Sequence, residues 1–141
     1  AGEHTSQPGG DGGDGIIVLR YDTTSQYNVT LGADMSLQSV ANTASSVPTK
    51  GDLVILMEDD TGTAGINTDI KGYISRDGSN FTQGTLVNEG TWGTNKKILA
   101  FHNLDISGQP SGTSMKYKIT THNQNNTSKI TTIHAASIGW K

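Results

Sequence analysis

The chain has 141 residues, of which 32% are hydrophobic and 16% are charged, and its formal net charge is -3. This length fits one domain, and the abundance of Gly, Ser, Thr and Asn argues against a helical bundle. No basic stripe is present to attract a phosphate backbone, and no apolar run is long enough to cross a bilayer. We therefore expect no nucleic-acid partner and no membrane insertion.

The first 15 residues, AGEHTSQPGGDGGDG, have no apolar periodicity. Such a segment cannot bury enough surface to offset its ordering entropy, so we expect a flexible or docking N-terminal arm over residues 1–15. The glycine-aspartate run matches one copy of a calcium-binding nonapeptide, but that site needs stacked repeats. An apolar pattern begins at Ile16, and we expect one domain over residues 16–141 with its first strands in IIVLRY and Tyr27–Leu31.

The middle of the chain continues as strands. Residues 35–39 alternate before a loop that contains Pro48, and residues 53–57 form a continuous apolar run. Such a run is typical of a strand covered on both faces, so we expect it to be the central strand. Residues 66–75 alternate between an apolar and a polar face, which predicts a further strand.

The C-terminal half repeats the same pattern. We expect strands over residues 81–87, 97–106, 115–121 and 129–140, and both faces of the last carry apolar or small residues, which predicts that it is well covered. Short strands separated by turns, with no helical period, predict an all-β fold. We expect an antiparallel β-sandwich of the jelly-roll or immunoglobulin-like kind, with a glycine-rich N-terminal arm.

The stretch YISRDGSNFTQGTL is close to the Asp-box turn of sialidases. Here Gly78 follows Asp77 directly and the motif occurs once. Asp-Gly between two alternating segments is the usual signal of a β-hairpin, which we expect at this place. A glycosidase would also need a pair of catalytic carboxylates or a tyrosine with arginine clamps, and the chain has only two arginines, Arg20 and Arg76.

Two groups of residues are candidates for ligand contacts. Glu58, Asp59 and Asp60 supply hard oxygen atoms of the kind that calcium binds, but their spacing matches no dedicated calcium loop, and a solvated strand end is the favoured interpretation. Trp92 lies in a glycine-rich loop, and His122 and Asn123 begin a polar loop. Aromatic faces stack on sugars and amides bond to hydroxyls, so we expect these loops to be the surface of any carbohydrate contact. We identify no catalytic residue and expect no cofactor and no metal.

From Met35 onward the chain resembles a group of virion-associated proteins of tailed bacteriophages, common in marine and environmental samples. The resemblance is carried, in order along the chain, by SLQSVANTA, GDLVILMED, INTDIKGYISRDG, TWGTNKKILA, DISGQPSGTSMKYKI and IHAASIGW. It implies a β-rich fibre, tail or capsid-surface component that is multimeric and not enzymatic. No site residues come with it.

We therefore expect a non-enzymatic structural protein of a phage virion, located at the particle surface. It would act as a homo-oligomer, with a trimer favoured, together with other virion proteins, and it would contact a host glycan if it takes part in attachment. The alternative is a carbohydrate-binding module or adhesin domain that uses the loops around Trp92 and residues 122–128.

Overall fold

The computed structural model describes residues 33–141. The expected arm and the strands expected at residues 16–21 and 27–31 lie outside the described residues. The regular elements of the described part are all strands, and no helix within it is long and apolar enough to span a bilayer. Its strands are β1 (Ser36–Gln38), β2 (Asn42–Thr43), β3 (Lys50–Thr61), β4 (Ile70–Ser75), β5 (Thr82–Gly84), β6 (Val87–Thr91), β7 (Lys96–Asp105), β8 (Ser114–Thr121) and β9 (Ile130–Trp140).

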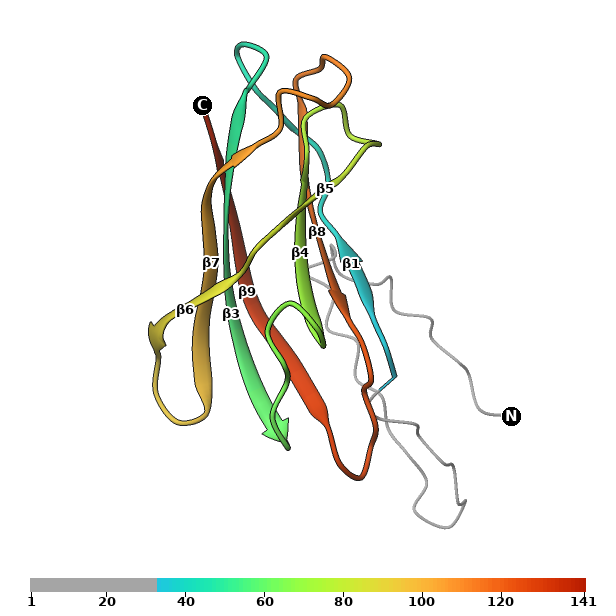
Figure 1. The fold of residues 1–141 in the computed structure, drawn as a ribbon, viewed down its shortest axis with the longest axis vertical. Coiled ribbons are helices and arrows are strands. Elements are labelled where there is room, and N and C mark those ends of the chain that lie inside the picture. Colours follow the sequence, from blue (N-terminus) through green and yellow to red (C-terminus); the bar gives the residue numbers. More distant parts are fainter. Residues whose placement is uncertain (1–32) are drawn as a thin grey trace, which may run out of the picture.

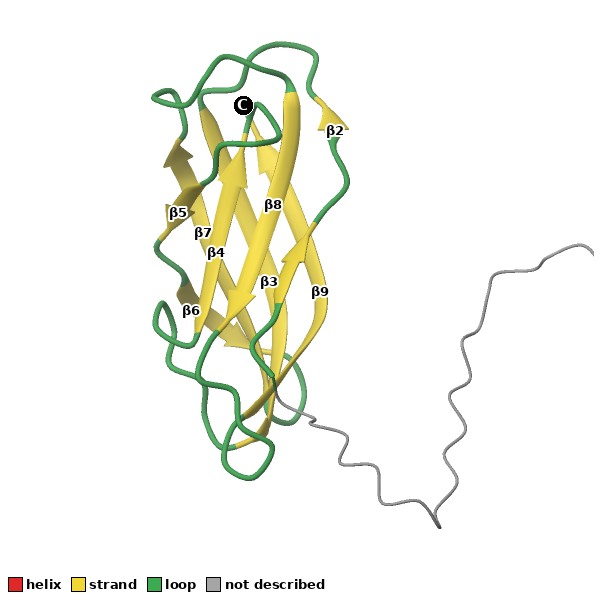
Figure 2. Ribbon diagram, turned by 90° about the vertical axis from the view of Figure 1, so that its right-hand side faces the viewer, coloured by secondary structure: helices red, strands yellow, loops and turns green. Residues whose placement is uncertain are grey.

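The strands form two antiparallel sheets packed face to face, as in a β-sandwich (Figure 1). One sheet has the order β1-β8-β4-β5, with β2 also paired to β8. The other has the order β6-β7-β3-β9. Figure 2 shows the first sheet in front of the second. The predicted all-β class and the antiparallel pairing are confirmed.

The core lies between the sheets and is built by alternation along each strand. In β3 every second side chain, Leu53, Ile55 and Met57, is completely buried. The facing sheet contributes its own fully buried residues, which are Ile70, Ile74, Met115 and Ile119. As predicted, β3 is central, because it pairs with β7 on one side and β9 on the other. Its outer side chains, Val54 and Leu56, are only half-buried, since that face of the sheet is covered by neighbouring side chains rather than by another layer.

Three expectations about individual strands are wrong. The strand expected at residues 81–87 is two strands in different sheets, β5 and β6, because the chain crosses between the sheets at Leu86, whose amide and carbonyl bond to the Asn67 side chain. The strand expected at residues 66–75 begins only at Ile70, because Gly65 to Asp69 form a turn in which the Gly65 carbonyl accepts the amides of Thr68 and Asp69. The last strand, β9, is not well covered. It is the edge of its sheet, and its side chains are half-buried or exposed.

The Asp-Gly hairpin is confirmed. Strands β4 and β5 pair antiparallel on either side of the turn, and Gly78 has φ of 81°. The carboxylate of Asp77 accepts hydrogen bonds from the amides of Ser79 and Asn80, the Asn80 side chain and the Ser75 hydroxyl. These bonds hold the pKa of Asp77 well below its ordinary value, with the Asn80 bonds as the main cause. The aspartate therefore builds the turn.

A buried arginine closes the same end of the sandwich. Arg76, 7% exposed, donates hydrogen bonds to four backbone carbonyls that belong to two loops: those of Pro48, Ser107, Gln109 and Pro110. A desolvated guanidinium is tolerated only when its donors are satisfied. Arg76 thereby fastens the loop before β3 and the loop between β7 and β8 to the end of β4.

Two facing glycines make room for an aromatic ring inside the sandwich. Gly72 of β4 pairs with Gly84 of β5, and the ring of Phe101, from the opposite sheet, lies directly against both. A Cβ atom built on Gly84 would overlap this ring. Glycine is therefore needed at residue 84 because of close approach and not because of backbone conformation.

We expect Gly84→Ala to destabilise the domain by about 2 kcal/mol, because the Phe101 ring must leave a closely packed position. The free energy of urea-induced unfolding measures this effect. Gly108→Ala is the matched control, since a Cβ there meets no atom within 4 Å, and it should change stability by less than about 0.5 kcal/mol. Equal stability of the two variants would contradict the packing described here.

Candidate functional site

Three connections meet at the end of the sandwich opposite Arg76 (Figure 1). They are the β3–β4 loop (residues 62–69), the turn of the β6–β7 hairpin (residues 92–95) and the β8–β9 loop (residues 122–129). We call this group the loop end. Loops at one end of a rigid sandwich are held by the strands but remain accessible, which is the usual situation of binding residues.

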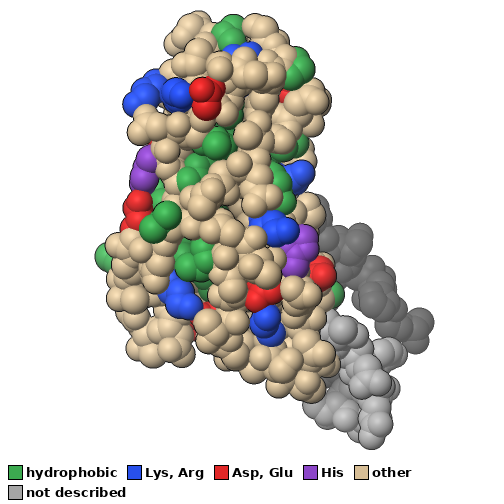
Figure 3. Space-filling view, viewed as in Figure 1, with side chains coloured by type: hydrophobic (Ala, Val, Ile, Leu, Met, Phe, Trp, Pro, Cys, Tyr) green, Lys and Arg blue, Asp and Glu red, His purple; other side chains and the backbone are tan. Residues whose placement is uncertain are grey.

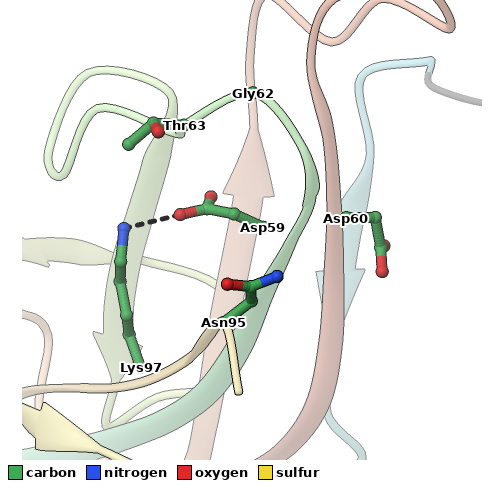
Figure 4. A pocket seen from close by; sticks show the side chains of 6 residues that line it. All are labelled: Asp59, Asp60, Gly62, Thr63, Asn95 and Lys97. Atoms are coloured by element: carbon green, nitrogen blue, oxygen red, sulfur yellow. Dashed lines mark hydrogen bonds and ion pairs between the residues drawn. The ribbon is translucent and has the colours of Figure 1, made fainter.

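An open polar cavity of about 380 Å³ lies at the loop end, lined by Asp59, Asp60, Gly62, Thr63, Asn95 and Lys97. Figure 4 shows the Lys97 ammonium against the Asp59 carboxylate, and these groups are 2.5 Å apart. Asp59 also accepts the amide of Ala64 and donates its own amide to the Asn95 carbonyl. It thus joins the β3–β4 loop to the β6–β7 hairpin, and the cavity offers hydroxyl, amide and neutralised charged groups suited to a polyhydroxylated ligand.

A buried aspartate, Asp69, joins the β3–β4 loop to the β8–β9 loop. Asp69, 5% exposed, accepts hydrogen bonds from Lys129 at 2.6 Å, from the Asn123 side chain at 2.8 Å and from the amide of Gly65 at 2.8 Å. These three bonds, with the Lys129 bond as the largest contribution, hold the pKa of Asp69 at about 2, below its ordinary value of 3.8. Asp69 therefore stays charged and fixes the β8–β9 loop.

The structure places all three expected sugar-contact residues at the loop end, but not around one cavity. Trp92 is 67% exposed at the tip of the β6–β7 hairpin. His122 is half-buried and bonds to the Thr120 hydroxyl at 2.9 Å, while Asn123 is committed to Asp69. The exposed Trp92 ring is therefore accessible to a ligand, whereas the Asn123 side chain stabilises the β8–β9 loop through its bond to Asp69.

The three acidic calcium candidates do not converge. Strand alternation sends Glu58 to the outer face, where it meets His134 at 2.6 Å and Lys96 at 3.3 Å. The His134 hydrogen bond is the main cause that lowers the pKa of Glu58. Asp60 accepts the Thr132 hydroxyl and points away from Asp59 (Figure 4). Across residues 33–141 no three His, Cys, Asp or Glu side chains gather in a way that could hold a metal ion.

Sequence reasoning missed Asn95 and Lys97 as cavity residues. They follow Trp92 in the chain, but a contact between Lys97 and Asp59 arises only from the pairing of β3 with β7. Neither a scan of protein-family models nor searches of curated proteins and solved structures finds a match to this chain. No related protein therefore informs the fold or the site, and both rest on the contacts within this chain.

We expect acid to loosen the loop end through Asp69. Because the folded-state pKa lies below the ordinary value, the stability that this carboxylate contributes is present above about pH 4 and is lost as the pH falls towards about 2. Asp69→Asn should destabilise the domain at pH 7 and should flatten the fall in stability between pH 4 and pH 2. Unfolding free energies measured at several pH values test this.

Asp34→Asn is the control. Asp34 is exposed and its carboxylate accepts the Gln124 amide, a bond that an asparagine oxygen also accepts, so the steepness of the fall should be unchanged. A fall as steep in Asp69→Asn as in the unmodified chain would show that Asp69 is not the group responsible.

Proposed function

We propose that this chain is a non-enzymatic structural component of a tailed-phage virion, as a fibre, tail or capsid-surface protein, and that it works by assembling with copies of itself and with other virion proteins. We propose further that the sandwich is of the jelly-roll or immunoglobulin-like type and that residues 1–15 are a flexible or docking arm. The sequence resemblance from Met35 onward supports this role. The structural observation that carries it is the edge strand β9.

Strand β9 is a long edge with little protection. It runs for 11 residues, from Ile130 to Trp140, and among residues 33–141 it pairs with β3 alone. Its sequence, ITTIHAASIGW, contains no Lys, Arg, Asp, Glu or Pro. Stable monomers usually blunt an edge with charges or proline, because unpaired amides and carbonyls recruit another strand. An edge of this kind favours pairing between subunits.

A carbohydrate-binding module is the second candidate function. The observation that favours it is the position of Trp92, which is two-thirds exposed on the same hairpin as Asn95 and Lys97 of the polar cavity. A large exposed ring on the same hairpin as hydrogen-bonding groups is suited to a sugar. Both functions fit one protein if a virion component contacts glycans of its host.

We expect the purified chain to have a native mass that is a multiple of its 14.9 kDa, as measured by light scattering. Ala135→Lys with Ser137→Lys places charges on the exposed side of β9 and should lower that mass. The matched control, Thr91→Lys with Thr94→Lys, adds the same charge at exposed residues of the β6–β7 hairpin and should leave the mass unchanged. A monomeric unmodified chain would overturn the assembly proposal.

For the second candidate, we expect Trp92→Ala to abolish glycan binding on an array, since stacking on the ring supplies much of the contact energy. Because the side chain is exposed, thermal stability should stay unchanged, and this serves as the control. Uniform absence of binding by the unmodified chain would leave only the assembly role.

A further inference from the structure

The outer face of the β1-β8-β4-β5 sheet carries three lysines and two aromatic rings. Lys71 and Tyr73 lie on β4, Lys116 and Lys118 lie on β8, and Phe81 precedes β5. The alternate side chains of β4 and β8, such as Ile70 and Ile119, are buried in the core, so the lysines and Tyr73 face outward. In Figure 3 basic side chains are visible on the right-hand flank of the molecule, which this sheet forms. We call this surface the lysine face.

Among residues 33–141, no ion pair neutralises the positive charge of the lysine face. In the described part of the chain, the lysines that form ion pairs are Lys50, Lys96, Lys97 and Lys129. Lys71, Lys116 and Lys118 form none with a described residue. Asp77, at the end of this face, is charged and accepts the Ser75, Ser79 and Asn80 hydrogen bonds of the turn, and it forms no ion pair with these three lysines. The three cations are therefore available to an anionic partner.

Two rings hold the central cation in place. The Lys118 ammonium is 4.6 Å from the centroid of the Tyr73 ring and 4.6 Å from that of the Phe81 ring. A ring attracts a cation through its quadrupole but does not neutralise its charge, in contrast to a carboxylate. Lys118 is thus ordered before any ligand arrives, which lowers the entropy cost of binding.

Neutral polar groups extend this arrangement across the sheet. Lys118 is paired with Gln38 of β1 and with Tyr73 of β4, and Tyr73 is paired with Gln83 of β5. Both glutamines are exposed. The resulting row contains amide, ammonium, ring and amide groups in sequence, and Lys116 lies about 7 Å further along β8. A flat row of this kind fits an extended chain better than a small molecule.

We propose that the lysine face binds an anionic polysaccharide, with carboxylate or sulfate groups at the lysines and sugar hydroxyls at the glutamines. This surface belongs to the sheet that lacks β9, and it includes none of Trp92, His122 and Asn123, so it is distinct from the sites discussed above. A nucleic acid is less suited, because the row places neutral amides and a ring beside Lys118, and such groups suit a chain that carries hydroxyls as well as anionic groups better than a continuous phosphate backbone. Among the described residues, the acidic groups of the opposite sheet other than Asp60 are engaged with lysine or histidine, so its described surface offers little complementary charge.

The test is affinity electrophoresis of the full chain in gels that contain alginate, dextran sulfate or unsubstituted dextran. We expect retardation by alginate, by dextran sulfate or by both, and none by dextran. Retardation by alginate alone would show that the face binds carboxylated sugars. Retardation by dextran sulfate alone would show that it binds sulfated sugars. Lys71→Gln with Lys116→Gln and Lys118→Gln should weaken binding at low salt at least about tenfold. Phe81→Leu should weaken it about threefold, since Lys118 then loses one ring.

The matched control is Lys50→Gln with Lys96→Gln and Lys141→Gln, which changes the net charge by the same amount at residues outside the lysine face. It should bind within about twofold of the unmodified chain, since it leaves the local charge of the face intact. Three outcomes would overturn the proposal: no retardation of the unmodified chain, equal losses in the two triple variants, or binding to double-stranded DNA as tight as to either charged polysaccharide.

Discussion

The inward side chains of β3 hold the two sheets together. Leu53, Ile55 and Met57 are completely buried, and because β3 pairs on both sides, its register decides which faces of β7 and β9 turn inward. A slip of one residue would exchange these side chains for the outward set, which includes the charged Glu58. Burying the Glu58 carboxylate away from His134 and Lys96 would cost more free energy than the slipped strand could gain from new contacts. The hydrophobic pattern of one strand thus specifies the arrangement of its whole sheet.

Polar side chains, rather than apolar ones, close the two ends of the sandwich. At one end Arg76 joins two loops through backbone carbonyls. At the other, Asp59 and Asp69 join three loops through amides and lysines. No buried side-chain nitrogen or oxygen of the described residues lacks a hydrogen-bond partner. Because these polar groups bond to one another, they stabilise the loops. Contacts with other molecules are therefore expected at the sheet surfaces, the sheet edge and the hairpin tip.

Those surfaces differ in chemistry because each belongs to a different structural element. Among the described residues, the edge strand β9 offers unpaired backbone groups and few charges, which suits strand pairing. The lysine face offers fixed positive charge around Lys118, which suits an anionic polymer. The hairpin tip offers the exposed ring of Trp92. If the proposals above hold, the protein would assemble with copies of itself through β9 and leave the lysine face and Trp92 open to a ligand.

The all-β class, the central position of β3 and the Asp77-Gly78 turn followed from the sequence alone, because strand alternation and turn chemistry depend on near neighbours in the chain. Alternation also placed Lys116 and Lys118 on one face. The exposure of β9 did not follow, since its apolar residues on both faces are equally compatible with a covered strand. The ring pair around Lys118 and the contact between Lys97 and Asp59 were decided by the tertiary structure. Both join residues far apart in the chain, and only the pairing of specific strands brings such residues together.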